Sequence, residues 1–246
     1  MSNMFGNLSS DGLEQQEDRL GGYTVFPTGI YTGTVKMAYG IQSQHGAKGV
    51  QLILDLDGKE YRETVYVTNR NGENFFLNKQ DASKKVPLPG FTTINDICAV
   101  TTELALADQD VEEKMVKVYD TNTKTEVPKA VPTLVNLLGK TVSVAINENI
   151  ENKTVQQNGK YVPVAEERRT NTIEKVFHTE SKMTVAELMR GDGKADFWDK
   201  WAEKYTGQAR DKRTIKDGQG GAPGRPGVAP AAGATAPKRS LFGNKG

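Results

Sequence analysis

Cysteine and histidine are nearly absent from this chain. Of its 246 residues, one is cysteine and two are histidine. A single cysteine cannot form an internal disulfide, which suits a reducing compartment, so we expect a cytoplasmic protein. His45, Cys98 and His178 are far apart and lack the paired spacing of a zinc site. We therefore expect no metal and no cofactor, and we interpret Cys98, which lies in an apolar helical pattern, as a small core residue.

Long hydrophobic runs and catalytic signatures are also missing. No apolar run approaches the ~20 residues of a membrane-spanning helix, and the first residues lack the basic-then-apolar layout of a secretion signal. Gly139-Lys140-Thr141 lacks the earlier glycine of a phosphate-binding loop and precedes a strand pattern. No Gly-x-Ser-x-Gly elbow occurs, and the carboxylates are scattered. General acid–base and nucleophilic catalysis have few candidate groups, so we expect a protein that is not an enzyme and has no membrane partner.

The net charge of +1 conceals an uneven distribution. Residues 207–246 are rich in Gly, Ala and Pro and carry eight Lys and Arg against two Asp, so their net charge is 8 − 2 = +6 and that of the preceding part is near −5. Such a segment cannot bury enough apolar surface to offset its ordering entropy, so residues 207–246 are predicted to be a disordered tail and residues 1–22 a flexible arm. The tail ends in a candidate docking motif for partner proteins, formed by Lys238, Arg239, Ser240, Leu241 and Phe242; a merely solubilising tail is the alternative.

Two alternating apolar runs that meet at Asp57-Gly58 give the strongest structural signal. Asp-Gly between such runs favours a two-residue hairpin turn, because both turn residues need positive φ. The implied register pairs Leu54 with Tyr61 and Ile53 with Arg62. The predicted core face carries Val50, Leu52, Leu54, Leu56, Tyr61, Val65 and Val67. The other face carries Gln51, Ile53, Asp55, Arg62, Thr64, Tyr66 and Thr68 and suits a half-wet surface that binds something flat and anionic.

The remaining periodicities predict further strands and helices. Strands are expected at 23–39, 48–57, 59–69, 140–147 and 171–178, and helices over 93–107, over 131–138 and after a capping box that starts at Thr184. A last helix places Phe197, Trp201 and Tyr205 on one face, which we interpret as packing against the sheet rather than as a binding stripe. The predicted fold is mainly β with several helices: a five-stranded Greek-key barrel of the oligonucleotide-binding (OB) kind over residues 23–206, followed by the tail.

Aromatic and cationic residues are interleaved in the second quarter of the chain. Proteins that bind single strands without sequence preference combine a cationic groove with aromatic rings on which bases stack. The candidate DNA-binding residues are Lys36, Tyr39, Lys48, Arg62, Tyr66, Arg70, Phe75, Phe76, Lys79, Lys84, Lys85 and Phe91. Core packing is the alternative for each aromatic residue taken alone, so the hypothesis depends on the interleaving.

Several stretches together resemble the single-stranded-DNA-binding proteins encoded by lytic bacteriophages. They are residues 29–76, Pro-Gly-Phe at 89–91, Leu-Leu-Gly-Lys at 137–140, and residues 171–177 with the helix that follows at Thr184. The resemblance is an overall pattern over about residues 23–205. It implies an OB barrel that coats single-stranded DNA cooperatively, with self-association on DNA, during replication, recombination or repair in the host cytoplasm.

The same resemblance implies a carboxyl tail that recruits replication, recombination or transcription proteins. Tails in that family are usually acidic, whereas this one is basic. Electrostatic autoinhibition by the tail is therefore not expected; the tail either adds DNA affinity or meets a different partner surface. Two other functions remain open on the sequence: a structural or adaptor protein that binds other proteins through its last helix and tail, and a hydrolase with an unrecognised site.

Overall fold

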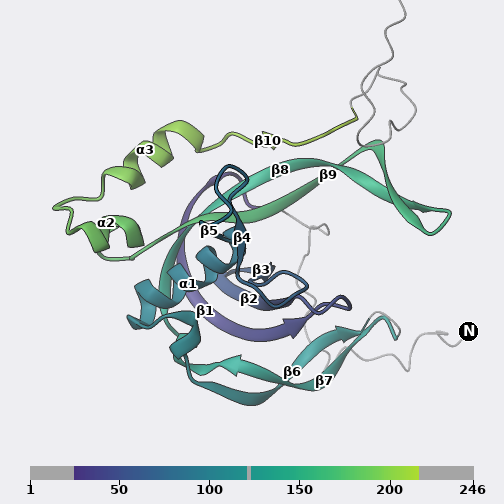
Figure 1. Ribbon diagram of the computed structural model, residues 1–246, viewed down its shortest axis with the longest axis horizontal. Coiled ribbons are helices and arrows are strands. Elements are labelled where there is room, and N and C mark those ends of the chain that lie inside the picture. The colour runs from purple at the N-terminus through teal and green to yellow at the C-terminus, as the bar shows by residue number, and fades with distance from the viewer. Residues whose placement is uncertain (1–24, 121–122, 216–246) are drawn as a thin grey trace, which may run out of the picture.

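The computed structural model describes residues 25–120 and 123–215 (Figure 1). The predicted arm at 1–22 and the docking motif at 238–242 lie outside the described residues. The strands are β1 (Gly29–Gln42), β2 (Lys48–Leu56), β3 (Lys59–Tyr66), β4 (Phe75–Leu77), β5 (Lys85–Pro87), β6 (Val111–Asp120), β7 (Thr125–Leu134), β8 (Thr141–Gln157), β9 (Lys160–Phe177) and β10 (Arg210–Asp211). The helices are α1 (Pro89–Thr102), α2 (Val185–Arg190) and α3 (Asp196–Tyr205), with short 3₁₀ turns η1 (Leu106–Asp108) and η2 (Val135–Leu137).

One large antiparallel sheet dominates the molecule, which confirms the mainly β class. Its central strands follow the order β3–β2–β1–β8–β9, and β7 pairs with both β1 and β6. We predicted a closed or nearly closed barrel from these five strands. Within the described residues no backbone ladder joins β9 to β3, so full closure is not confirmed. Instead the Glu63 carboxylate on β3 accepts a hydrogen bond from the Ile173 backbone N–H on β9 at 3.0 Å.

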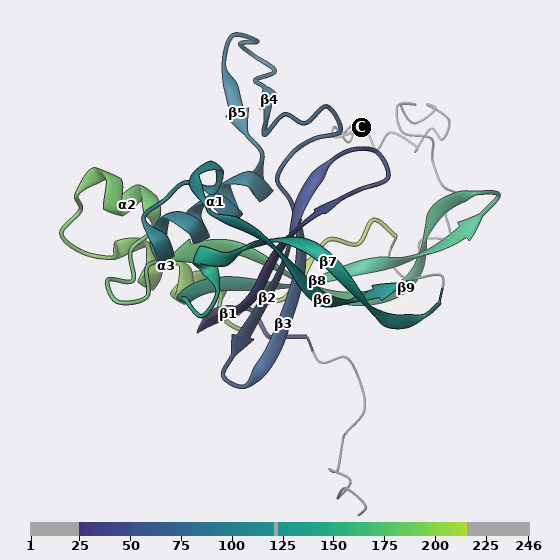
Figure 2. The same cartoon turned by 90° about the horizontal axis from the view of Figure 1, so that it is seen from below.

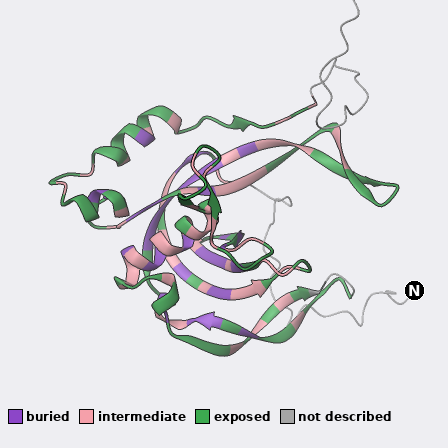
Figure 3. Cartoon of the chain, in the orientation of Figure 1, coloured by how far each residue is buried: buried purple, intermediate pink, exposed green. Residues whose placement is uncertain are grey.

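The main core lies on the inner face of this curved sheet, where α1 covers it. Ile94, Ile97 and Cys98 of α1 pack against buried residues of β1, β2, β3, β8 and β9. Cys98 is buried, as predicted, and this burial raises the pKa of its thiol to about 12. Figure 3 shows the buried residues gathered on these strands and α1, whereas the far ends of the β6–β7 and β8–β9 hairpins are mainly exposed.

The hairpin at Asp57-Gly58 is confirmed together with its register. Both turn residues have positive φ, 53° and 77°, and Leu54 pairs with Tyr61 while Ile53 pairs with Arg62. All seven residues of the predicted core face are buried. Turn chemistry and period-2 alternation were therefore sufficient to place the centre of the fold.

Two predicted helices differ from the observed elements. The helix expected over 93–107 begins earlier, with Pro89 in its first turn, and ends at Thr102, where Glu103 adopts a left-handed conformation. The helix expected over 131–138 is wrong: β7 continues to Leu134 and only η2 follows. Pro132 resembled a helix start, but it lies in β7 opposite Glu113 of β6, so tertiary strand pairing overrode the local signal.

Two predicted strands continue well beyond their expected ends. β8 and β9 were expected at 140–147 and 171–178, yet they form a long hairpin around an Asn158-Gly159 turn. The chain after α3 then follows β8: the Lys212 N–H donates to the Ile150 carbonyl, and the Asn152 side chain binds the backbone of Thr214 and Ile215. The described fold thus extends nine residues past 206, the predicted end of the domain, to residue 215.

The C-terminal helices follow their local signals. Thr184 and Glu187 form the predicted capping box at the start of α2. On α3, Trp201 packs with Ala145 and Phe177 in a small buried cluster, with Trp198 and Tyr205 at its border. Trp201 and Tyr205 therefore attach α3 to the sheet, as interpreted from the sequence, whereas Phe197 of the same stripe is 36% exposed.

Candidate nucleic-acid interface

The outer face of β1, β2 and β3 carries four of the predicted site residues. Lys36 and Tyr39 lie on β1, and Arg62 and Tyr66 lie on β3. Tyr39, Arg62 and Tyr66 are connected through β2. Tyr39 pairs with Gln51 of β2, and the Gln51 side chain accepts a hydrogen bond from Thr64, which lies between Arg62 and Tyr66 on β3. This polar face is the counterpart of the apolar face that builds the main core.

A groove runs between this face and the β6–β7 hairpin. It encloses about 560 Å³ and is lined by Tyr39, Gly40, Ile41, Gln42, Lys48, Gly49, Val118, Lys129, Ala130, Val131 and Pro132. Lys48 and Lys129 are exposed on its two sides, and neither forms an ion pair with another described residue. Among the residues that the structure describes, the groove therefore presents two positive charges without a partner carboxylate.

Tyr39 forms part of the floor of this groove rather than an open stacking platform. Its side chain is only 6% exposed and packs with Ile53 and Val131. Burial raises the pKa of the Tyr39 hydroxyl, and the positive charge of Arg62 partly offsets this effect. Little of the Tyr39 ring is thus available for stacking, which differs from its predicted role.

Tyr66 is the ring that remains available beside the groove. It pairs with Gly49, and a Cβ added at Gly49 would lie 3.1 Å from Cδ1 of the Tyr66 ring. The missing side chain at Gly49 thus lets the ring lie close against β2. Tyr66 nevertheless stays 46% exposed, so one side of the ring is open to a base.

Several predicted cations are neutralised by neighbouring carboxylates. Arg62 bonds to Glu60 on its own strand and lies 3.9 Å from Glu126 on β7. Lys36 pairs with Asp55 at 3.1 Å, and Lys84 pairs with Asp81 at 3.3 Å. These exposed pairs are weak, so a phosphate can compete for the cations, but their charge is not free in the unbound protein.

The β4–β5 hairpin holds a second group of predicted residues. Figure 2 shows that this hairpin projects from the body of the molecule, away from the β6–β7 hairpin. Phe76 and Leu77 are exposed, and the Lys85 ammonium lies 4.2 Å from the centroid of the Phe75 ring. Lys79 and Lys84 are exposed near its tip. The structure thus separates Phe75, Phe76, Lys79, Lys84 and Lys85 from the groove.

The last two predicted residues occupy different surroundings. Arg70 is exposed in the loop after β3, and its carbonyl oxygen would lie 3.3 Å from a Cβ added at Gly46, so this loop touches the β1–β2 turn. Phe91 lies in the first turn of α1 and packs, half-buried, against the main core. Phe91 is therefore a packing residue, the alternative that we considered for each aromatic side chain.

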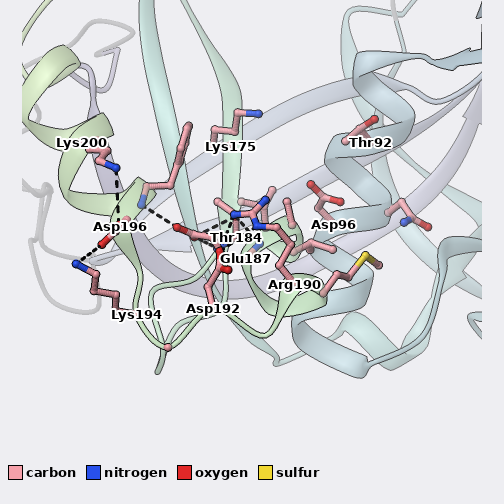
Figure 4. A pocket seen from close by; sticks show the side chains of 17 residues that line it. Thr92, Asp96, Lys175, Thr184, Glu187, Arg190, Asp192, Lys194, Asp196 and Lys200 are labelled. Carbon is pink, nitrogen blue, oxygen red and sulfur yellow. Dashed lines mark hydrogen bonds and ion pairs between the residues drawn. The ribbon is translucent and has the colours of Figure 1, made fainter.

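A larger cleft of about 900 Å³, which the sequence did not indicate, lies between α1, the end of β9, α2 and α3. Figure 4 shows charges of both signs along it, and many of them are already paired. Asp196 pairs with Lys194 and Lys200, and Arg190 pairs with Asp192. Glu187 accepts hydrogen bonds from the N–H groups of Thr184 and Phe197, and the accepted hydrogen bonds outweigh burial and hold its pKa low. This cleft has no single-sign surface for a phosphate chain.

Lys129 and Val118, on the far side of the groove, were not among the site residues predicted from the sequence. Their strands were not recognised, because the segment containing Val131 and Pro132 was predicted to be a helix. The alternation from Met115 to Tyr119 was the signal that could have found this hairpin.

No protein-family model matches the chain, and no curated protein matches it. Across residues 25–120 and 123–215, no three His, Cys, Asp or Glu side chains are grouped so that they could hold a metal ion. In the same part of the chain, no helix is both long and apolar enough to cross a membrane.

Proposed function

We propose that this protein binds single-stranded DNA without sequence preference and has no catalytic activity of its own. The observation that carries the proposal is the groove lined by Gly49, Lys48 and Lys129, with the exposed ring of Tyr66 next to it; the two lysines form no ion pair with a described residue. Stacking is tolerant of sequence because every base has a π face, and the two cations suit a phosphate backbone.

The strand order supports the same proposal. β1, β2 and β3 precede α1, with the short β4–β5 hairpin in between. After the β6–β7 hairpin, β8 pairs with β1 and β9 pairs with β8. A partly open OB barrel is expected to have this order, with the hydrogen bond from the Ile173 N–H to Glu63 in the place of the ladder that would close it. OB domains bind oligonucleotides on the face of their second and third strands, and here that face contains Gly49 and Tyr66.

The proposal includes the replication, recombination and repair setting implied by the resemblance to phage proteins. Coating of exposed single strands is a task for which sequence-tolerant stacking is suited. The β4–β5 hairpin is then a second contact, where Phe76 and the nearby lysines meet the strand after it leaves the groove. The tail remains a proposed docking segment for partner proteins.

The test is titration of a fluorescently labelled oligo-dT with the full-length protein at two salt concentrations. Affinity is expected to fall with salt, because each neutralised phosphate releases counterions. Tyr66→Ala is expected to weaken binding roughly tenfold, since a stacked base contributes about 1–3 kcal/mol. Tyr66→Phe retains the ring and is expected to bind like the parent protein.

Charge is tested separately from stacking. Lys48→Ala combined with Lys129→Ala removes two phosphate contacts and should reduce the slope of log K against log salt by about 1.4, since each contact to a single strand contributes about 0.7. Lys140→Ala, at an exposed position away from the groove, is the matched control and should leave the slope unchanged. Absence of binding even at low salt would refute the function itself.

A further inference from the structure

The outer edge of β6 is an unpaired strand edge. β6 pairs with β7 over all ten of its residues, and no other described strand pairs with it. In Figure 1 the β6–β7 hairpin forms the lower rim of the molecule, with no labelled element beyond β6. Such an edge presents N–H and C=O groups that can pair with another strand.

One face of β6 is apolar and exposed at three positions. Val111, Met115 and Tyr119 are 56%, 67% and 59% exposed. The residues of the opposite parity, Val116 and Val118, face inward and pack against the cluster that contains Tyr39. The exposed apolar residues are therefore not needed for the packing of the hairpin on its own sheet.

Two charged residues alternate with these apolar side chains. Glu113 and Lys117 are exposed, and neither forms an ion pair with another described residue. Along the strand, the outward face thus reads apolar, acidic, apolar, basic, apolar. This order becomes self-complementary when the strand is reversed, with Met115 at its centre.

We propose that β6 pairs antiparallel with β6 of a second copy of this chain, with the two-fold axis at Met115. Glu113 then lies opposite Lys117 of the second copy, and Val111 lies opposite Tyr119 of the second copy; symmetry repeats each pair. Directly opposed residues of an antiparallel pair share one face, and opposite charges or aromatic and β-branched partners there stabilise the pairing.

The neighbouring registers are less favourable. If the register shifts by one residue, the outward-facing residues of one strand lie directly opposite the inward-facing residues of the other. The exposed apolar face of one copy would then adjoin the inward face of the second copy. Moving the axis to residue 114 or 116 puts Glu113 and Lys117 opposite apolar side chains. Moving it to 113 or 117 puts two like charges opposite each other, which is destabilising.

The expected assembly is a closed dimer. A two-fold contact uses the same surface on both copies and leaves no further β6 edge open, so it ends at two chains. The large sheet then continues through β7 and β6 into β6 and β7 of the second copy. This dimer requires no DNA, so its failure would leave the proposed binding of single strands untouched, and the reverse also holds.

Sedimentation velocity of the full-length protein without DNA, over a range of micromolar to near-millimolar concentrations, tests the dimer. Glu113→Lys and Lys117→Glu each place like charges opposite each other twice, and each is expected to raise the dissociation constant at least about tenfold. The double variant, Glu113→Lys with Lys117→Glu, restores both ion pairs and is expected to restore the dimer.

Mixing the two single variants provides the sharpest test. Glu113→Lys has lysine at both positions and Lys117→Glu has glutamate at both, so the mixture is expected to form a heterodimer more tightly than either variant pairs with itself. Lys160→Glu, an equal change of charge at the β8–β9 turn, is the matched control and should remain dimeric. A parent protein that is monomeric throughout, or single variants that dimerise like the parent, would overturn the proposal.

Discussion

Glu63 links the two ends of the central sheet at the point where backbone pairing is missing. Its carboxylate accepts hydrogen bonds from the Tyr61 hydroxyl at 2.7 Å and from the Ile173 N–H at 3.0 Å. Burial nevertheless raises the pKa of Glu63, because these hydrogen bonds and the charge of Lys212 offset the loss of hydration only in part. The link is therefore made by a group whose charged form is disfavoured in the folded state.

Replacing Glu63 with glutamine should alter how stability depends on pH. The pKa of Glu63 is higher in the folded than in the unfolded chain, so the folded state binds the proton first as pH falls. The parent protein therefore gains stability relative to Glu63→Gln as the pH falls from neutral to the pKa of Glu63 in the unfolded chain. Thermal unfolding at about pH 7 and about pH 5 measures the difference, which is expected to favour the glutamine variant most at the higher pH.

Glu63→Ala is the informative comparison. It removes the acceptor for the Ile173 N–H and leaves a buried donor unpaired, so it should destabilise the protein at both pH values. A difference between parent and Glu63→Gln that does not change with pH would show that Glu63 does not titrate abnormally.

At the scale of elements, the position of α1 depends on a close approach to β3. A Cβ added at Gly90, in the first turn of α1, would lie 2.2 Å from the carbonyl oxygen of Tyr66. This contact is to backbone, which cannot move aside as a flexible side chain can. Gly90 thus brings the start of the helix against the same residue whose ring borders the groove.

Gly90→Ala is expected to destabilise the protein by roughly 1–3 kcal/mol, because overpacking displaces the helix, despite the better helix propensity of alanine. Chemical denaturation of the two proteins measures the change. Gly193→Ala is the matched control, since a Cβ there meets nothing within 4 Å. Equal stability of the two variants would contradict the proposed seating of α1.

At the scale of the whole molecule, the chain after α3 is attached along the β8–β9 hairpin. Arg210 bonds to Glu174 at 2.9 Å, and Arg213 bonds to Glu167 at 3.1 Å. The backbone of Lys212 bonds to Ile150, and the backbone of Thr214 and Ile215 bonds to the Asn152 side chain. Residue 215, the last residue of the described range, therefore lies beside this hairpin and not beside α3.

Truncation after residue 215 and truncation after residue 207 should consequently differ. The longer protein retains the segment that contains β10, so its melting temperature should match that of the full chain. The shorter one loses several hydrogen bonds that each contribute about 0.5–1.5 kcal/mol, so it should melt several degrees lower. Equal melting temperatures would show that residues 208–215 do not contribute to stability.

Much of the central fold, but only part of the candidate site, could be predicted. Asp57-Gly58 determined its own hairpin and register, and Thr184 with Glu187 determined the start of α2, because turn and capping chemistry act within a few residues. The same sequence logic chose Tyr66 and Lys48. It could not show that the Tyr39 ring is buried. Nor could it show that Glu126, 64 residues further along the chain, lies near the Arg62 guanidinium group.

By itself, the amino-acid sequence determined the alternation of β2 and β3, the buried role of Cys98 and the packing stripe of α3, since each depends on periodicity along one element. The position of β6 and β7 across the outer face of β1, which brings Lys129 to the groove, depends instead on tertiary contacts. The reason is physical: which strand edge a segment meets depends on contacts across long sequence separations, and these contacts overrode the helix signal at Pro132.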